Sequence, residues 1–103
     1  SVEHKAWVKK LESYIHGETQ FPPQLDETRC RFGRWVELQQ RDDPNFILNN
    51  QRVVVLHKNV HHLAGEIIEC VKEKDIQQAL SILKILKSQS DLLVLEIHKM
   101  LKN

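Results

Sequence analysis

The feature of this chain that most constrains its fold is a pair of histidines, His57 and His61, set into the apolar face of a long helical stretch. Apolar residues recur at helical spacing from about Phe46 to Glu73, which predicts one long helix there. At roughly 100° per residue, His57 and His61 fall inside the apolar arc of that helix, whereas His62 points away from it. The arc consists of Val53, Val60, Ala64, Ile67, Ile68 and Val71. Because a buried imidazole needs a hydrogen-bond partner or a metal ion, the fold must provide one of them here.

Two further helices are predicted at the ends of the chain. The first runs from about Val2 to His16 and ends at Gly17, a residue that commonly terminates helices. The last runs from Ile76 to about Leu101, with Asp75 as its N-terminal cap. Both stretches carry apolar residues at helical spacing, so each has a face to bury.

A loop and a short helix are predicted between the first helix and the long one. The loop contains Phe21-Pro22-Pro23, which cannot continue a helix, and the short helix runs through Cys30, Trp35 and Leu38. Helices joined by short loops are typical of an antiparallel bundle. The chain is therefore predicted to be all-α, an antiparallel four-helix bundle in which the short helix carries the cysteine.

The length and the charge of the chain disfavour several classes of protein. The 103 residues suit one domain, residues 1–103, and because the chain begins without Met we expect it to be part of a longer protein. Fifteen Lys and Arg face fourteen Asp and Glu, so no basic excess points to nucleic acid or to an anionic membrane. No apolar run approaches the roughly 18–20 residues of a membrane span, and no secretory signal is visible. We therefore expect a cytoplasmic protein whose Cys30 and Cys70 are reduced.

Three of the six histidines face the predicted core. His4 shares a face of the first helix with Trp7, and His57 and His61 stand at positions i and i+4, where both can reach one ion. Cys30 is the natural fourth ligand, because the start of a helix favours a thiolate. One thiolate and three imidazoles form a tetrahedral zinc set, whereas Mg²⁺ and Ca²⁺ prefer oxygen. A zinc site and a cluster of hydrogen-bonded core histidines both fit the residues alone.

Three short motifs carry a resemblance to a known family. His4-Lys5-Ala6-Trp7 resembles its HxxW motif, and Cys30-Arg31-Phe32-Gly33-Arg34-Trp35 resembles its CxxGxW motif. His57-Lys58-Asn59-Val60-His61 resembles its HxxVH motif. The motifs occur in the family's order and with similar separations. The chain is thus similar to the chemoreceptor zinc-binding (CZB) domain of bacteria.

The resemblance implies a cytoplasmic four-helix bundle that binds one Zn²⁺ through His4, Cys30, His57 and His61. It also implies a homodimer and a covalently linked output domain outside this chain, in a chemotaxis receptor or a diguanylate cyclase. Such a domain is a sensor of zinc or of oxidants such as hypochlorous acid, and is not an enzyme. Cys30 would be the oxidisable ligand, since it is the only thiolate of the four.

Other residues are expected to support the site. Trp7 and Trp35 are predicted to pack against it and exclude water, and Gly33 to let the short helix approach a neighbour closely. Cys70 has no partner in the motifs and is expected to be a plain buried cysteine.

Two apolar residues of the last helix, Ile85 and Leu92, lie off its main apolar arc. That arc consists of Ala79, Ile82, Leu83, Leu86, Leu93, Ile97 and Met100. Apolar side chains seven residues apart fit either a helix–helix interface with another protomer or a broad core stripe, and the sequence leaves both open.

Two other metal-binding functions fit these residues less well than a zinc sensor does. A haemerythrin-like iron-binding four-helix bundle needs inward carboxylates, whereas Glu66 and Glu69 are predicted to point outward. A zinc hydrolase needs an open coordination position and usually a carboxylate base, but four protein ligands close the site and no HExxH motif occurs.

Overall fold

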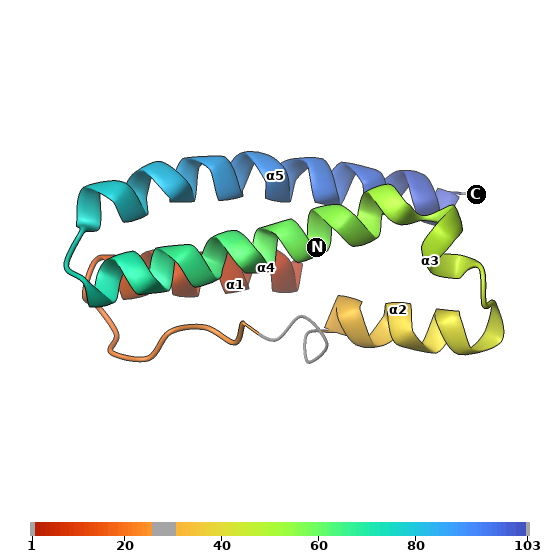
Figure 1. Cartoon of the computed structure of the whole chain (residues 1–103), viewed down its shortest axis with the longest axis horizontal. Helices are drawn as coiled ribbons and strands as arrows, with labels where there is room; N and C mark the ends of the chain where they lie inside the picture. Colours follow the sequence, from red (N-terminus) through yellow and green to blue (C-terminus); the bar gives the residue numbers. More distant parts are fainter. Residues whose placement is uncertain (1, 26–30, 103) are drawn as a thin grey trace.

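The computed structural model describes residues 2–25 and 31–102, with side chains from Lys5 onward. This part of the chain forms five helices, α1 (Val2–Ile15), α2 (Arg31–Asp42), α3 (Phe46–Asn49), α4 (Gln51–Lys72) and α5 (Ile76–Lys102) (Figure 1). No strand occurs in the two described ranges. The prediction of an all-α fold is therefore confirmed, and the antiparallel four-helix bundle stays a prediction.

The single long helix predicted from Phe46 to Glu73 is wrong near its start, where the structure divides it into α3 and α4. Asn50 lies between the two with φ −128° and ψ 35°. Its side-chain Nδ2 donates to the carbonyl of Phe46 at 2.9 Å, while its backbone N–H donates to the carbonyl of Ile47 at 3.2 Å. The side chain thus takes the carbonyl that the backbone N–H of Asn50 would bond in a continuous helix.

The main core lies between α4 and α5, and α1 packs against both helices. Figure 1 shows α5 running back alongside α4 after a short turn. Asp75 in this turn accepts a hydrogen bond from the backbone N–H of Gln78 at 3.2 Å, so its predicted role as a cap is confirmed. The apolar core residues are Leu11, Ile15, Val53, Val60, Ala64, Ile67, Ile68, Ala79, Ile82, Leu83, Leu86 and Leu93. Val71, Ile97 and Met100, predicted in the same arcs, pack at its margin.

The molecule is elongated, with extents of 44 × 21 × 21 Å. At about 1.5 Å per residue, the 27 residues of α5 span nearly the whole long axis. An ion pair between Lys87 Nζ and Glu12 Oε1, at 2.9 Å, joins α5 to α1 beside the core. α5 is therefore the longest helix, and the other helices are arranged along it.

Helix α2 contributes little to the core, because Gly33 is its only buried residue. Its C-terminal end is joined to α3 through Gln40, which donates to the carbonyl of Pro44 at 2.9 Å and accepts from the backbone N–H of Ile47 at 3.1 Å. Burial of apolar side chains therefore stabilises α2 less than it stabilises α1, α4 or α5.

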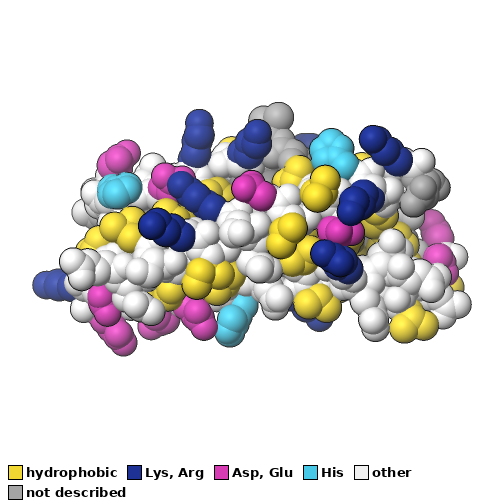
Figure 2. Space-filling view, turned by 90° about the horizontal axis from the view of Figure 1, so that it is seen from above, with side chains coloured by type: hydrophobic (Ala, Val, Ile, Leu, Met, Phe, Trp, Pro, Cys, Tyr) yellow, Lys and Arg dark blue, Asp and Glu magenta, His cyan; other side chains and the backbone are white. Residues whose placement is uncertain are grey.

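Ile85 and Leu92 lie on the surface of α5, with 53% and 38% of their area exposed. Figure 2, which looks down on the molecule from above, shows apolar side chains among Lys, Arg, Asp and Glu on this face. These two residues are therefore not part of the core of a single chain.

Within residues 2–25 and 31–102, no helix is both long and apolar enough to cross a bilayer.

Helices α1 and α4 end in the same way but with different residues. After α1, Gly17 has φ 75°, its N–H donates to Tyr14, and the N–H of Glu18 donates to Ser13. After α4, Lys74 has φ 63°, with the corresponding bonds from Lys74 to Val71 and from Asp75 to Cys70. Both are Schellman ends, in which a left-handed residue lets two backbone N–H groups satisfy the last carbonyls. Only the first has the glycine that this conformation favours.

Substitutions at the two left-handed residues, Lys74 and Gly17, are expected to shift the free energy of unfolding in opposite directions. Lys74→Gly should raise the free energy of unfolding by about 0.5–1 kcal/mol, because it removes the left-handed strain of a side chain. Gly17→Ala should lower it by about 1 kcal/mol, purely through the backbone, since a Cβ there would meet nothing within 4 Å. Urea unfolding followed by circular dichroism measures both, and equal shifts of the same sign would contradict the assignment.

Candidate metal centre

His57 and His61 lie one turn apart on α4 and are buried side by side. They are 5% and 7% exposed, and their ring centroids are 4.6 Å apart. His62 is exposed, with its Nε2 3.4 Å from Glu66 Oε1. The predicted inward position of His57 and His61 and the outward position of His62 are therefore confirmed.

One ring nitrogen of His61 lies within hydrogen-bonding distance of a backbone carbonyl. Nδ1 of His61 lies 3.0 Å from the backbone carbonyl oxygen of Leu25, in the loop after α1. Because a carbonyl oxygen only accepts, Nδ1 must be the protonated nitrogen and the donor. In the neutral ring the lone pair is then on Nε2, which is the arrangement of a histidine that binds a metal through Nε2.

Aromatic rings from α1 and α2 contact the two imidazoles. The ring of Trp7 on α1 lies 4.8 Å from that of His61, and Phe32 on α2 lies 5.0 Å from His57 in an edge-on arrangement. Trp35 lies one ring further out, 5.9 Å from Phe32 and 5.5 Å from Phe46 on α3. This aromatic cluster covers the histidines with apolar surface, which limits the access of water and strengthens any charge interaction inside.

Two of the four predicted ligands are not among the described side chains. His4 belongs to α1, one turn before Trp7, but its side chain is not described, and Cys30 lies outside the described residues. Among the side chains that are described, no group of three or more His, Cys, Asp or Glu is placed to hold a metal. The structure therefore brings together His57 and His61, and the four-ligand set stays a prediction.

No carboxylate is buried beside the two histidines among the described side chains. In the described ranges the buried polar side chains are His57, His61 and Ser90. The side chains of Glu66 and Glu69 are 49% and 68% exposed, as predicted. A di-iron centre of the haemerythrin kind needs inward carboxylates, and neither Glu66 nor Glu69 supplies one.

Gly33 and Cys70 differ in their relation to the site. Gly33 is buried and lines a cleft between α2, α3 and α4 that reaches His57. Cys70 is only half-buried, so the expectation of a buried cysteine is met in part. Desolvation, together with the nearby Asp75 and Glu73, raises the pKa of the Cys70 thiol, which disfavours its thiolate at neutral pH.

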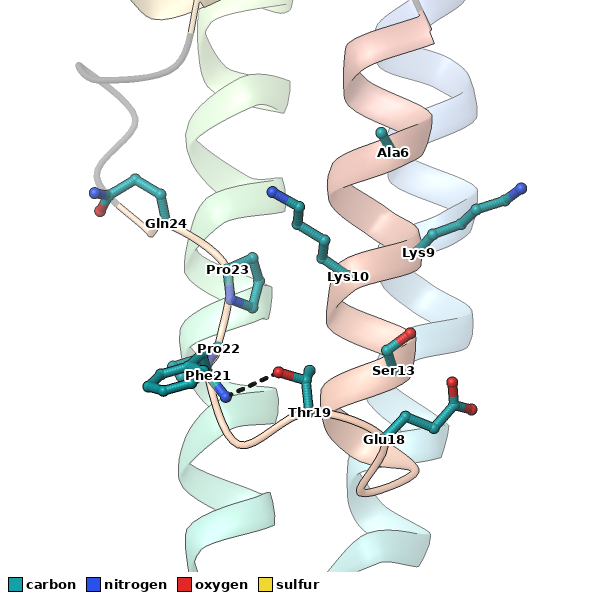
Figure 3. A pocket seen from close by; sticks show the side chains of 10 residues that line it. All are labelled: Ala6, Lys9, Lys10, Ser13, Glu18, Thr19, Phe21, Pro22, Pro23 and Gln24. Carbon is teal, nitrogen blue, oxygen red and sulfur yellow. Dashed lines mark hydrogen bonds between the residues drawn. The ribbon is translucent and has the colours of Figure 1, made fainter.

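Sequence reasoning missed the loop carbonyl that bonds His61 and the ring that covers His57. Pro22-Pro23 was the signal for the first, because two prolines keep the chain extended as it runs back beside α1 (Figure 3). For Phe32 the signal was its place inside the cysteine motif, between Cys30 and Gly33.

Comparison with known families supports these motifs. Residues 4–68 match the family model described as the chemoreceptor zinc-binding domain. The match spans all three motifs and ends within α4, so α5 lies outside it. Searches of curated proteins and of solved structures found no match.

Phe32→Ala is expected to loosen α2 selectively, because the contact between Phe32 and His57 is one of its few links to α4. We expect the opening free energy of α2 to fall by about 1–2 kcal/mol for a half-buried ring, with α4 and α5 unchanged. Hydrogen–deuterium exchange with peptide resolution measures this. Phe21→Ala is the matched control, since Phe21 is 79% exposed. Unchanged exchange in α2 would show that the ring does not hold the helix.

Proposed function

The chain belongs to the chemoreceptor zinc-binding domain family, and we propose that it is a regulatory domain that holds one Zn²⁺ through His4, Cys30, His57 and His61. The family is by name zinc-binding and is sensory rather than catalytic, so we propose no enzymatic activity for this chain. The four residues are those of the three motifs, and all lie within the matched range.

The observation that carries this proposal is the contact of each buried histidine with an aromatic residue of another motif. Trp7, three residues after His4, lies against His61, and Phe32, two residues after Cys30, lies against His57. The three motifs thus meet around one pair of imidazoles, although they are far apart in the sequence. This convergence is what a single ion bound by all three motifs requires.

The donor chemistry of the site also fits zinc. Two neutral imidazoles one turn apart can reach one ion, and the bond from Nδ1 of His61 to the Leu25 carbonyl leaves Nε2 as its ligand atom. A third imidazole and a thiolate would complete a closed tetrahedral set. When bound, the ion would supply a cross-link between the segments that carry the motifs.

Regulation follows from the weak attachment of α2. Cys30 directly precedes α2, whose own buried surface is small. A zinc–thiolate bond would therefore add a large share of the free energy that keeps α2 against α4. Oxidation of Cys30, or loss of zinc, would remove this link and shift the population towards a detached α2.

The proposal also includes the cellular location, the oligomeric state and the linked output domain. We place the domain in the cytoplasm, as a homodimer linked to an output domain outside this chain, in a chemotaxis receptor or a diguanylate cyclase. The exposed Ile85 and Leu92 of α5 fit a contact between two protomers, each an antiparallel bundle of α1, α2, α4 and α5.

Zinc content tests the proposal directly. Protein reconstituted with zinc under reducing conditions should hold about one ion per chain, measured by elemental analysis after gel filtration. His57→Ala, His61→Ala and Cys30→Ala should each weaken binding on the order of a hundredfold, because structural zinc sites contribute roughly 10–16 kcal/mol over four ligands.

His62→Ala and Cys70→Ala are the matched controls. Each removes the same residue type beside the site, but His62 is exposed and Cys70 lies outside the motifs, so both variants should keep wild-type zinc content. Wild-type protein without zinc, or zinc lost equally in controls and ligand variants, would contradict the proposal.

A further inference from the structure

We propose that Trp7 is a positioning residue for the metal site, acting through the loop segment Gln24–Leu25. Its indole N–H holds this segment against α1 and α4, and the Leu25 carbonyl in turn keeps the proton of His61 on Nδ1. The inference rests on the proposed zinc site, because the role given to Trp7 is to present Nε2 of His61 to the ion.

Two neighbouring carbonyls of the segment bond to two different helices. Nε1 of Trp7 on α1 donates to the carbonyl of Gln24 at 2.8 Å, and Nδ1 of His61 on α4 donates to the carbonyl of Leu25 at 3.0 Å. Because the two carbonyls belong to adjacent residues, one short segment is bonded to both helices. The rings of Trp7 and His61 also touch, which closes a loop of contacts through α1, the segment and α4.

The loop before the segment Gln24–Leu25 has a restricted backbone conformation, which places the segment beside α1 and α4. The residues before prolines are restricted to extended conformations, so both Phe21 and Pro22 are kept extended. The backbone N–H of Phe21 donates to Oγ1 of Thr19 at 3.2 Å, and Figure 3 shows the chain running back beside α1 from there to Gln24. Pro23, just before the segment, is buried, and the side chain of Leu25 packs against the core. Both contacts fix the position of the segment.

The tautomer of His61 is the property that this arrangement controls. A neutral imidazole carries its proton on whichever nitrogen has the better hydrogen-bond acceptor, and a metal then binds the other nitrogen. The acceptor here is a loop carbonyl, which α4 alone cannot hold in place. The hydrogen bond of Trp7 to the adjacent residue supplies that support. Loss of the indole N–H should therefore loosen the acceptor and reduce the fraction of His61 whose proton is on Nδ1.

The experiment removes the indole N–H and keeps an aromatic ring. Two replacements of Trp7 serve, Trp7→Phe and the incorporation of β-(3-benzothienyl)alanine, which keeps the size and shape of tryptophan but has no N–H. Both should weaken zinc binding about 10- to 100-fold in a chelator competition, the usual effect of losing a group that orients a ligand. Tyr14→Phe is the matched control and should keep the wild-type affinity, because it removes a polar hydrogen from an aromatic ring of the same helix that packs against the core two turns away from Trp7.

The second readout is the tautomer itself, measured by ¹⁵N NMR of the imidazoles in metal-free protein at a pH where His61 is neutral. Wild-type His61 should carry its proton on Nδ1, and both Trp7 replacements should move part of the population to Nε2. A proton on Nε2 in the wild type, or a tautomer and zinc affinity unchanged by either replacement, would overturn the inference. Because this measurement uses no metal, failure of the proposed function appears separately, as wild-type protein that binds no zinc.

Discussion

Two imidazoles buried side by side in an apolar core are the constraint on which the rest of this structure depends. Each ring carries a donor and an acceptor, and leaving either without a partner in such surroundings costs roughly 1–3 kcal/mol. α4 cannot satisfy them itself, because its own backbone groups are used in the helix. The loop after α1 therefore bonds His61, and aromatic residues of α1 and α2 cover the pair. The proposed zinc ion would bond one nitrogen of each ring.

The chain divides into a stable support and a weakly attached element. α4 and α5 share the main core, with α1 against both, whereas α2 buries only Gly33. The cysteine motif begins immediately before this least buried helix. A domain of this kind can respond to the loss of one bond without unfolding, because the support keeps most of its buried surface while α2 changes position. The family match ends before α5, so the whole of this helix lies outside the matched range.

Helical periodicity predicted most of the fold, and local side-chain chemistry accounts for what it missed. The apolar arcs of α1, α4 and α5 were recognisable because burial repeats every three to four residues. The break at Asn50 was not, since it depends on a side chain that competes with its own backbone for the Phe46 carbonyl. At the site, the inward histidines followed from the helical wheel. The carbonyls of Gln24 and Leu25 did not, because backbone acceptors in a loop leave no residue pattern. Only the paired prolines indicated that this loop has a defined course.

X-ray absorption spectroscopy at the zinc edge of the reconstituted protein identifies the atoms that bind the metal. We expect four ligands, one sulfur at about 2.3 Å and three nitrogens at about 2.0–2.1 Å, with imidazole scattering beyond the first shell. The sulfur signal should disappear in Cys30→Ala and remain in Cys70→Ala. A shell of oxygen and nitrogen without sulfur in the wild type, or a sulfur signal that depends on Cys70, would contradict a centre made of His4, Cys30, His57 and His61.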